Sequence, residues 1–183
     1  DADEPIQRAV ELFEAGAADT LMKGNVVIGD LLKGYLQHLK RSGFALRRLS
    51  HLSLFEIPGR GKLLGVTDAG INTYPDVDAR IEILENALDA LRLLNHRQPK
   101  VAVISAVEKP SRAVESSTQA QAIAARLQDR DDLIIDGPIS VDIALSSHAA
   151  KEKGYAGRIR GDADLLLLPD IDAGNVIYKA FTA

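Results

Sequence analysis

The sequence contains no cysteine and no tryptophan. Without cysteine, the chain has no disulfides, no thiolate zinc site and no cysteine nucleophile. Its aromatic residues are four phenylalanines and four tyrosines, which is little material for the platforms on which nucleic-acid bases stack. The formal net charge of −4 leaves no basic surplus to neutralise phosphates, so we expect neither a nucleic-acid partner nor an anionic membrane partner.

Long apolar runs are lacking as well. No stretch approaches the roughly 18 residues of a membrane-spanning helix, and the first residues are acidic where a secretory signal would be basic. We therefore expect a cytoplasmic protein without a membrane partner. Hydrophobic residues make up 46% and charged residues 26% of the 183, as in ordinary soluble domains.

Short apolar runs alternate with longer amphipathic stretches, which is typical of an α/β fold. Helical spacing of apolar residues predicts helices over 3–17, 27–41, 76–95, 116–128 and 140–153, and a last helix after residue 175. The fourth of these helices would begin at a capping box, Ser116-x-x-Gln119. Strands are predicted over 18–22, 51–57, 63–67, 101–105, 133–135 and 165–168.

The arrangement of these elements predicts a three-layer α/β/α fold with a mostly parallel sheet. Residues 101–105 and 165–168 are continuously apolar, like strands buried on both faces of a parallel sheet. Residues 51–57 and 63–67 flank Pro58-Gly59-Arg60-Gly61-Lys62, which predicts an antiparallel hairpin insertion. We expect one domain over residues 1–183, with a possible division into two lobes at about 1–98 and 99–183.

In open α/β sheets, ligands bind where strands end and loops lead into helices. Five such junctions combine small and polar residues: Lys23-Gly24-Asn25, 67–72, 105–109, Asp136-Gly137-Pro138 and 169–175. At the first, free N–H groups and the charge of Lys23 suit an anion, although an ordinary strand-to-helix turn would have the same residues. His51 could face the ligand crevice or make a structural hydrogen bond.

Carboxylates are frequent in the second half of the chain: Asp136, Asp142, Asp162, Asp164, Asp170 and Asp172. They could supply a general base or a hard-cation site, or they could cap helices and lie in solvated loops. The spacing of a calcium loop is absent, the four histidines have no metal-ligand spacing, and there is no G-x-S-x-G elbow. We therefore expect no metal site.

Several junctions resemble the motifs of one enzyme family. Residues 161–179, GDADLLLLPDIDAGNVIYK, resemble the G-x-A-D-(apolar)-P-D-(I/L)-x-(A/S)-G-N-(apolar)-x-x-K segment of the phosphate acetyltransferase and phosphate butyryltransferase family. Further segments of this chain resemble family motifs and follow in the same order: LMKG at 21–24, LSH at 49–51, TDAGIN at 67–72, VAVISAVE at 101–108 and DGP at 136–138. Met22-Lys23-Gly24 and Val107-Glu108 are more similar to the butyryl-type branch.

The resemblance implies transfer of an acetyl, propionyl or butyryl group between coenzyme A and inorganic phosphate, both bound as substrates, with no cofactor and no metal. It also implies a homodimer and a fold like that of the isocitrate and isopropylmalate dehydrogenases. By the same resemblance, the phosphate side of the crevice is lined by Lys23, Gly24 and Asn25. The other substrate-binding residues it implies are Asp68, Asn72, Ser105, Asp136, Asp170 and Asn175.

The chain also departs from the family pattern. Family members are longer at both ends, and they continue into an S-R-x-D segment to which catalysis is usually assigned. No S-R-x-D occurs among the 183 residues, so no catalytic residue is assigned. Two alternatives to the acyltransferase remain: a non-catalytic homologue that binds coenzyme A or an acyl phosphate, and a metal-dependent dehydrogenase of the same fold.

Overall fold

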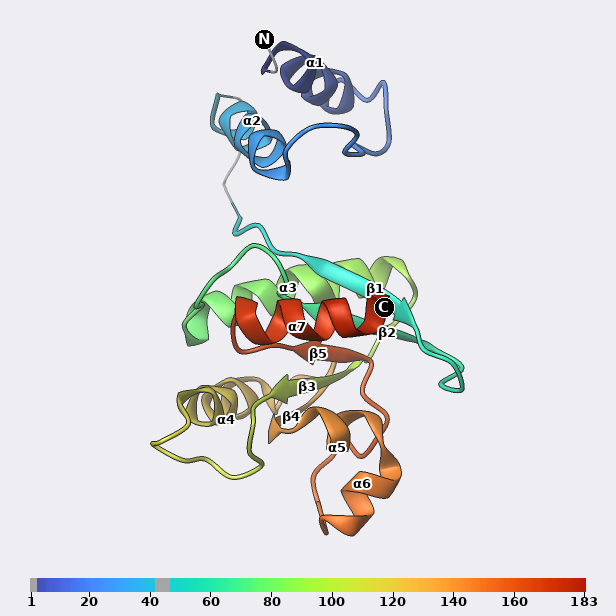
Figure 1. The fold of residues 1–183 in the computed structure, drawn as a ribbon, viewed down its shortest axis with the longest axis vertical. Helices are drawn as coiled ribbons and strands as arrows, with labels where there is room; N and C mark the ends of the chain where they lie inside the picture. The colour runs from blue at the N-terminus through green and yellow to red at the C-terminus, as the bar shows by residue number, and fades with distance from the viewer. Residues whose placement is uncertain (1–2, 42–46) are drawn as a thin grey trace. The chain divides into compact units, whose positions relative to one another are not determined.

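The computed structural model describes residues 3–41 and 47–183 (Figure 1). It divides the chain into two compact units, Asp1–Arg47 and Arg48–Ala183, which are described separately below. The lobe boundary expected near residue 98 does not coincide with this division and remains a prediction. Residue 98 lies within the second unit, between a helix and a strand.

The first unit contains two amphipathic helices, α1 (Asp3–Glu14) and α2 (Ile28–Arg41). Ile6 and Val10 of α1 are buried. A Cβ atom at Gly34 of α2 would lie 2.6 Å from the Cγ2 atom of Ile6, so the glycine allows the two helices to pack closely. The strand predicted over 18–22 is wrong, because these residues have no regular secondary structure.

The second unit is built on a five-stranded sheet in the order β1-β2-β5-β3-β4. The strands are β1 (Leu52–Glu56), β2 (Leu63–Thr67), β3 (Lys100–Ile104), β4 (Ile134–Ile139) and β5 (Leu165–Leu167). β1 pairs antiparallel with β2 as a hairpin, and the other pairs are parallel. The predicted mostly parallel sheet with a hairpin is confirmed.

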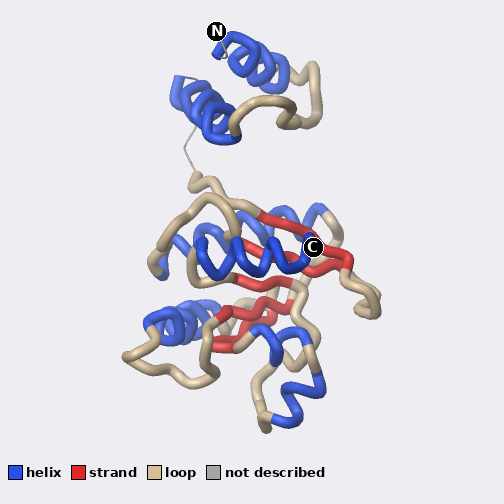
Figure 2. The backbone as a smooth tube through the Cα atoms, viewed as in Figure 1, coloured by secondary structure: helices blue, strands red, loops and turns tan. Residues whose placement is uncertain are grey.

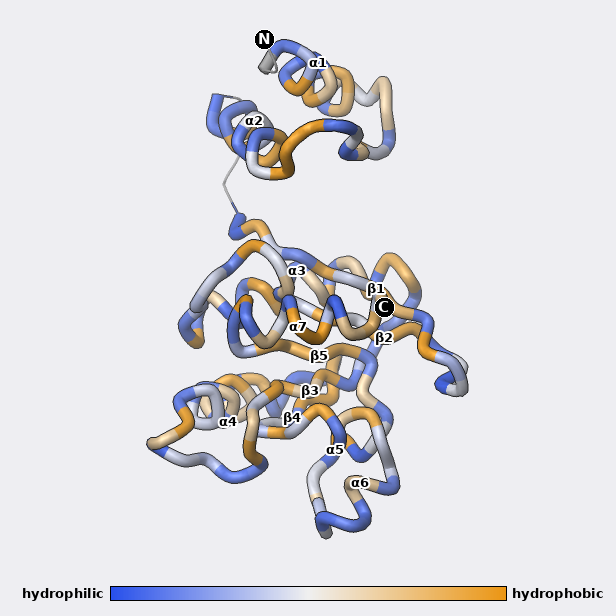
Figure 3. The backbone as a smooth tube through the Cα atoms, in the orientation of Figure 1, coloured by the Kyte–Doolittle hydropathy of each residue, from blue (hydrophilic) through white to orange (hydrophobic). Residues whose placement is uncertain are grey.

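Helices cover both faces of this sheet (Figures 1 and 2). The helices are α3 (Val77–Leu93), α4 (Glu115–Leu127), α5 (Val141–Leu145), α6 (Ser147–Glu152) and α7 (Ile171–Thr182). Successive residues of β5 point to opposite faces: Leu165 and Leu167 pack with α3 and α4, whereas Leu166 packs with α5 and α7. Burial on both sides explains the unbroken hydrophobic runs of the central strands in Figure 3.

β4 extends further than the sequence predicted. It was expected to end before Asp136-Gly137-Pro138, but it runs through them to Ile139. β4 is an edge strand, where a proline needs no partner for its missing N–H group. A Cβ atom at Gly137 would lie 2.7 Å from the Cβ atom of Val103, so only glycine lets the two strands approach this closely.

Three helix boundaries also differ from the prediction. The capping box at Ser116 is wrong, because α4 begins at Glu115 after Val114 and Ser116 lies in its first turn. The helix expected over 140–153 is two short helices that meet at Ser146. The last helix begins at Ile171 rather than after residue 175, because the Asp170 side chain caps its first turn.

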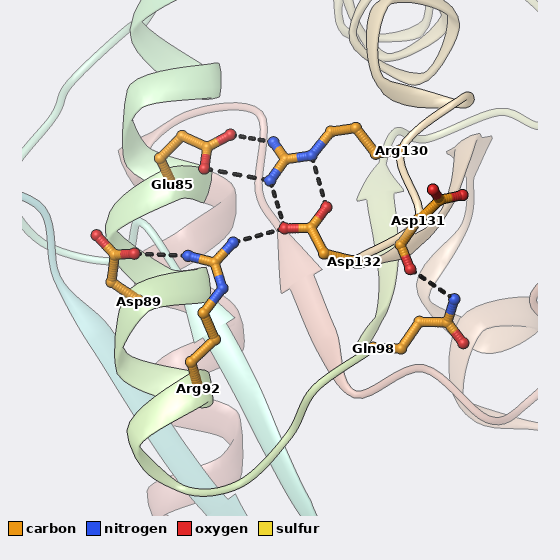
Figure 4. Close-up of polar contacts among 7 residues, drawn as sticks. All are labelled: Glu85, Asp89, Arg92, Gln98, Arg130, Asp131 and Asp132. Carbon is orange, nitrogen blue, oxygen red and sulfur yellow. Dashed lines mark hydrogen bonds and ion pairs between the residues drawn. The ribbon is translucent and has the colours of Figure 1, made fainter.

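An ion-pair network joins α3 to the loop that precedes β4 (Figure 4). Arg130 pairs with Glu85 of α3 and with Asp132, whose other partner is Arg92 of α3 at 2.6 Å. The Arg130 hydrogen bonds, and then that of Arg92, hold the pKa of Asp132 well below its usual range. The network lies at the end of the sheet where the parallel strands begin, and it connects α3 to the loop before β4.

We expect Asp132→Asn to destabilise the protein by about 1 kcal/mol at pH 7, the upper range for partly exposed pairs. The pKa of Asp132 is lower in the folded than in the unfolded chain. Its contribution to the free energy of unfolding is therefore complete above the unfolded pKa of about 4. This contribution is lost as the pH falls through the folded pKa. The difference in thermal midpoint between wild type and variant should therefore shrink from pH 7 to pH 3.

The matched control is Asp131→Asn, because Asp131 joins the contacts of Figure 4 through its backbone carbonyl, which accepts from Gln98 at 2.9 Å. Equal midpoints for Asp132→Asn and wild type at pH 7 would show that the network adds no stability.

Candidate functional site

The parallel strands β2, β5 and β3 end side by side, and the residues that follow them, Asp68, Asp170 and Ser105, form what we call the carboxyl edge of the sheet. A cavity of about 220 Å³ opens at this edge. Its walls come from the β2–α3 loop, the first turns of α4 and the loop before α7. The lining residues are Tyr74, Pro75, Asp76, Glu115, Ser116, Gln119, Pro169 and Asp170.

Asp68 organises the loop that follows β2. Its residue is only 3% exposed, and its carboxylate accepts hydrogen bonds from the backbone N–H groups of Gly70 (2.8 Å), Ile71 (2.9 Å) and Asn72 (3.3 Å). The side-chain amide of Asn72 donates to the same carboxylate at 2.6 Å and to the carbonyl of Leu49 at 2.9 Å. The structure thus brings two predicted site residues into direct contact and uses both to shape the loop.

Asn175 joins this loop from α7. Its side-chain amide donates to the carbonyl oxygen of Ala69 at 3.2 Å. A Cβ atom at the preceding Gly174 would lie 2.3 Å from the carbonyl oxygen of Asp68, so the glycine lets α7 rest directly on the loop. Asn175 therefore ties the first turn of α7 to the end of β2.

Asp170 lines the cavity, and Ser105 lies buried behind it, in contact with a lining residue. The hydroxyl of Ser105 lies 3.0 Å from that of Ser116, which lines the cavity. The carboxylate of Asp170 accepts from the N–H group of Ala173 at 2.9 Å, and the residue also lines the cavity. The expectation that carboxylates cap helices therefore holds for Asp170, which is half-buried and also lines the cavity.

Sequence reasoning missed the residues that supply most of this lining. Ser116 and Gln119 had been assigned to a helix cap, and they instead face the cavity from the first turns of α4. The signal available was their position, because polar side chains in the first turn after a buried strand lie at the carboxyl edge. Tyr74 was also missed; its hydroxyl donates to Asp172 at 3.1 Å, and this hydrogen bond raises the pKa of Tyr74.

Asp136 lies away from the cavity, in the middle of β4 rather than after its end. Its carboxylate accepts from the backbone N–H groups of Arg158 (2.6 Å), Ile159 (3.3 Å) and Gly137 (3.0 Å). These bonds hold the 157–159 loop against the edge strand. The expected placement at a strand end is corrected, and a substrate contact by Asp136 remains a prediction.

Lys23, Gly24 and Asn25 belong to the first unit. The Lys23 ammonium donates to the carbonyl oxygens of Gly24 at 3.0 Å and Val26 at 3.1 Å, so it closes its own turn. An apolar hollow of about 460 Å³ lies beside Lys23 in this unit. The role of Lys23, Gly24 and Asn25 on the phosphate side of the crevice remains a prediction.

Asp142 belongs to an ion-pair cluster with Glu108 and Lys153. Lys153 lies 2.9 Å from both Glu108 and Asp142, and the Ser140 hydroxyl lies 2.5 Å from each of these carboxylates. The Ser140 contact, followed by that of Lys153, lowers the pKa of Asp142 to about 2. Because Lys153 pairs with both carboxylates and Ser140 contacts both, this cluster has the character of a structural network.

Asp162 and Asp164 form ion pairs, whereas the buried Nδ1 atom of His51 has no hydrogen-bond partner among the described residues. Asp164 pairs with Lys62 at 2.5 Å and Asp162 pairs with Lys100, both where the parallel strands begin. The ring of His51 contacts that of Tyr178 edge-on, with centroids 5.6 Å apart.

Within residues 3–41 and 47–183, no group of three or more histidine, aspartate or glutamate side chains is placed to hold a metal ion. In the same part of the chain, no helix combines the length and the apolar character needed to cross a membrane.

The fold and the cavity define a class: an α/β protein with helices on both faces of a mostly parallel sheet and a polar cavity at the carboxyl edge. Comparison with known proteins gives the family. Residues 2–183 match the family described as "Phosphate acetyl/butaryl transferase", and the chain belongs to this family.

Similar proteins agree with this assignment. The chain is 38% identical to a phosphate butyryltransferase of Clostridium acetobutylicum, over 96% of this chain and 58% of that protein. It is 34% identical to a phosphate acetyltransferase of Thermotoga maritima, over 97% and 61% respectively. A branched-chain phosphotransacylase from Enterococcus faecalis superimposes with a TM-score of 0.89 at 37% identity, covering all of this chain and 65% of that one. The chain thus spans about three fifths of the length of these curated relatives.

We expect Asp68→Asn to lower the free energy of unfolding by about 1.5–3 kcal/mol, the range for hydrogen bonds to a charged group. Asparagine keeps the size of the side chain but replaces one acceptor oxygen with an N–H donor that faces other donors. Urea denaturation followed by circular dichroism measures the change. The control is Asp129→Asn, an exposed carboxylate, for which we expect no more than about 0.5 kcal/mol. A loss as small as that of the control would contradict the role given to Asp68.

Proposed function

We propose that the full chain transfers an acyl group between coenzyme A and inorganic phosphate. The observation that carries the proposal is the cavity at the carboxyl edge. Its walls contain Asp170 of the PDIDAGN segment, and the TDAGIN loop at 67–72 supports the adjoining end of the sheet. Both segments resemble family motifs, and the similar proteins named above are phosphate acyltransferases.

The reaction requires no covalent enzyme intermediate. A phosphate oxygen attacks the thioester carbon of acyl-CoA, the C–S bond breaks, and the products are an acyl phosphate and the thiolate of coenzyme A; the reverse reaction retraces these steps. Alignment of two anionic substrates, with donors near the tetrahedral oxyanion, supplies most of the rate enhancement in such a reaction. The hydroxyl of Ser116 and the side-chain amide of Gln119 are suitable donors in the cavity wall.

The finer expectations belong to the same proposal. The acyl group is acetyl, propionyl or butyryl, with coenzyme A and phosphate bound as substrates and no cofactor. The protein acts in the cytoplasm as a homodimer, and its complete fold is like that of the isocitrate and isopropylmalate dehydrogenases. Family membership and the resemblance of Met22-Lys23-Gly24 to the butyryl-type branch support these points.

The first test measures release of the coenzyme A thiol from acetyl-, propionyl- and butyryl-CoA, with and without phosphate. We expect phosphate-dependent release, with the longer acyl groups preferred and no effect of a chelator. Folded protein that binds coenzyme A without releasing thiol would contradict the transfer and identify a binding-only homologue. Activity that depends on a divalent ion and a nicotinamide cofactor would instead identify the dehydrogenase alternative.

A further inference from the structure

A fully buried arginine lies behind the wall of the cavity. Arg80, in the first turn of α3, is 0% exposed. Its Nη1 atom donates to the side-chain oxygen of Gln119 at 3.5 Å, and its Nη2 atom donates to the carbonyl oxygen of Leu167 at 3.4 Å. Gln119 lines the cavity, and Leu167 is the last residue of β5, so the guanidinium is in contact with two of the elements that form the site.

The fold alone does not account for a charge at this position. Burial of a guanidinium costs several kcal/mol unless good geometry and full hydrogen bonding offset the cost. Both hydrogen bonds of Arg80 are at the long limit, and its Nε atom has no hydrogen-bond partner in the part of the chain that the structure describes. An apolar side chain of similar volume would fill the same space without this cost.

Arg80 stays protonated although it is buried, and its charge interacts with a residue of the cavity wall. Burial lowers the pKa of Arg80 to about 10, and attraction by Asp170 opposes this change. The guanidinium is therefore protonated at neutral pH. Asp170 lines the cavity, so the buried cation and a carboxylate of the wall interact across the end of β5.

The lining of the cavity is acidic. It includes the carboxylates of Asp76, Glu115 and Asp170, whereas the described residues that line it include no lysine or arginine. An anionic substrate group entering the cavity would meet a negative wall. A cation in low-dielectric surroundings offsets such repulsion more strongly than a cation in water.

Arg80 also influences the orientation of the Gln119 side chain. Its Nε2 atom donates to the carboxylate of Glu115 at 3.0 Å, while its oxygen faces Arg80. Arg80 thus fixes which end of the amide is turned towards Glu115 and the N-terminal turn of α4.

We propose that Arg80 is a positioning residue of the phosphate site: its guanidinium orients Gln119 and offsets the charge of Asp170, so that the cavity accepts a phosphoryl anion. This inference rests on the proposed acyl transfer and deepens it, because it assigns the cavity to inorganic phosphate. It would replace the phosphate role predicted for Lys23, Gly24 and Asn25, which do not line this cavity. Arg80 itself is buried and acts through the residues in front of it.

The test compares Arg80→Met with wild type in the full chain. We expect the KM for inorganic phosphate to rise about tenfold to a hundredfold, the range for loss of one charge-assisted contact. The KM for butyryl-CoA should change less than threefold, and the thermal midpoint should stay equal or rise, because methionine removes a buried charge. Arg80→Lys should restore part of the phosphate affinity.

Two further variants sharpen the test. Arg92→Met removes the other arginine of α3, which lies in the network of Figure 4, and should leave both KM values unchanged. Gln119→Leu should raise the KM for phosphate, and its effect should not add to that of Arg80→Met, since the two residues form one contact.

An unchanged KM for phosphate in folded Arg80→Met, or a change no larger than that of Arg92→Met, would overturn the inference. Failure of the proposed function is distinguishable, because the wild type itself would then release no thiol. Calorimetric titration with inorganic phosphate needs no turnover: weaker binding by Arg80→Met than by wild type supports the inference, whereas equal binding or binding by neither overturns it.

Discussion

A carboxylate removed from water must be satisfied by nearby donors, and Asp68 finds them in the backbone of its own loop. Its hydrogen bonds with residues 70–72 turn the chain sharply after β2. Asn72 extends the contact to Leu49 ahead of β1, and Asn175 fixes α7 to Ala69. The β2–α3 loop, one wall of the cavity, and the start of α7 thus depend on a single buried side chain.

The two ends of the sheet have different physical roles. Where the parallel strands begin, charges are paired with each other: Arg130 with Glu85 and Asp132, and Lys62 with Asp164. Where they end, several polar groups line a cavity, and the Nε atom of Arg80, which contacts the lining residue Gln119, has no hydrogen-bond partner among the described residues. Ion pairs therefore lie at one end of the sheet, and the polar cavity lies at the other.

Much of the fold follows from local sequence patterns. The apolar run at Leu165–Leu167 indicated a strand buried on both faces, and the turn after residue 57 indicated the hairpin. The errors arise where tertiary contacts decide the outcome: Pro138 is accepted because β4 is at the sheet edge, and α4 begins without the expected cap. Family motifs pointed to Asp68, Ser105 and Asp170, whereas Arg80 has no local signal, because only the folded chain places it behind Gln119 and β5.

We propose that the carboxyl edge of the sheet binds the substrates. Nuclear magnetic resonance of the full chain, isotope-labelled and titrated with coenzyme A and then with inorganic phosphate, tests this most directly. We predict shift changes concentrated in residues 68–76, 115–119 and 169–175, with little change around Arg130 and Asp132. Changes concentrated around Arg130 and Asp132, or no saturable change in any residue, would contradict the account.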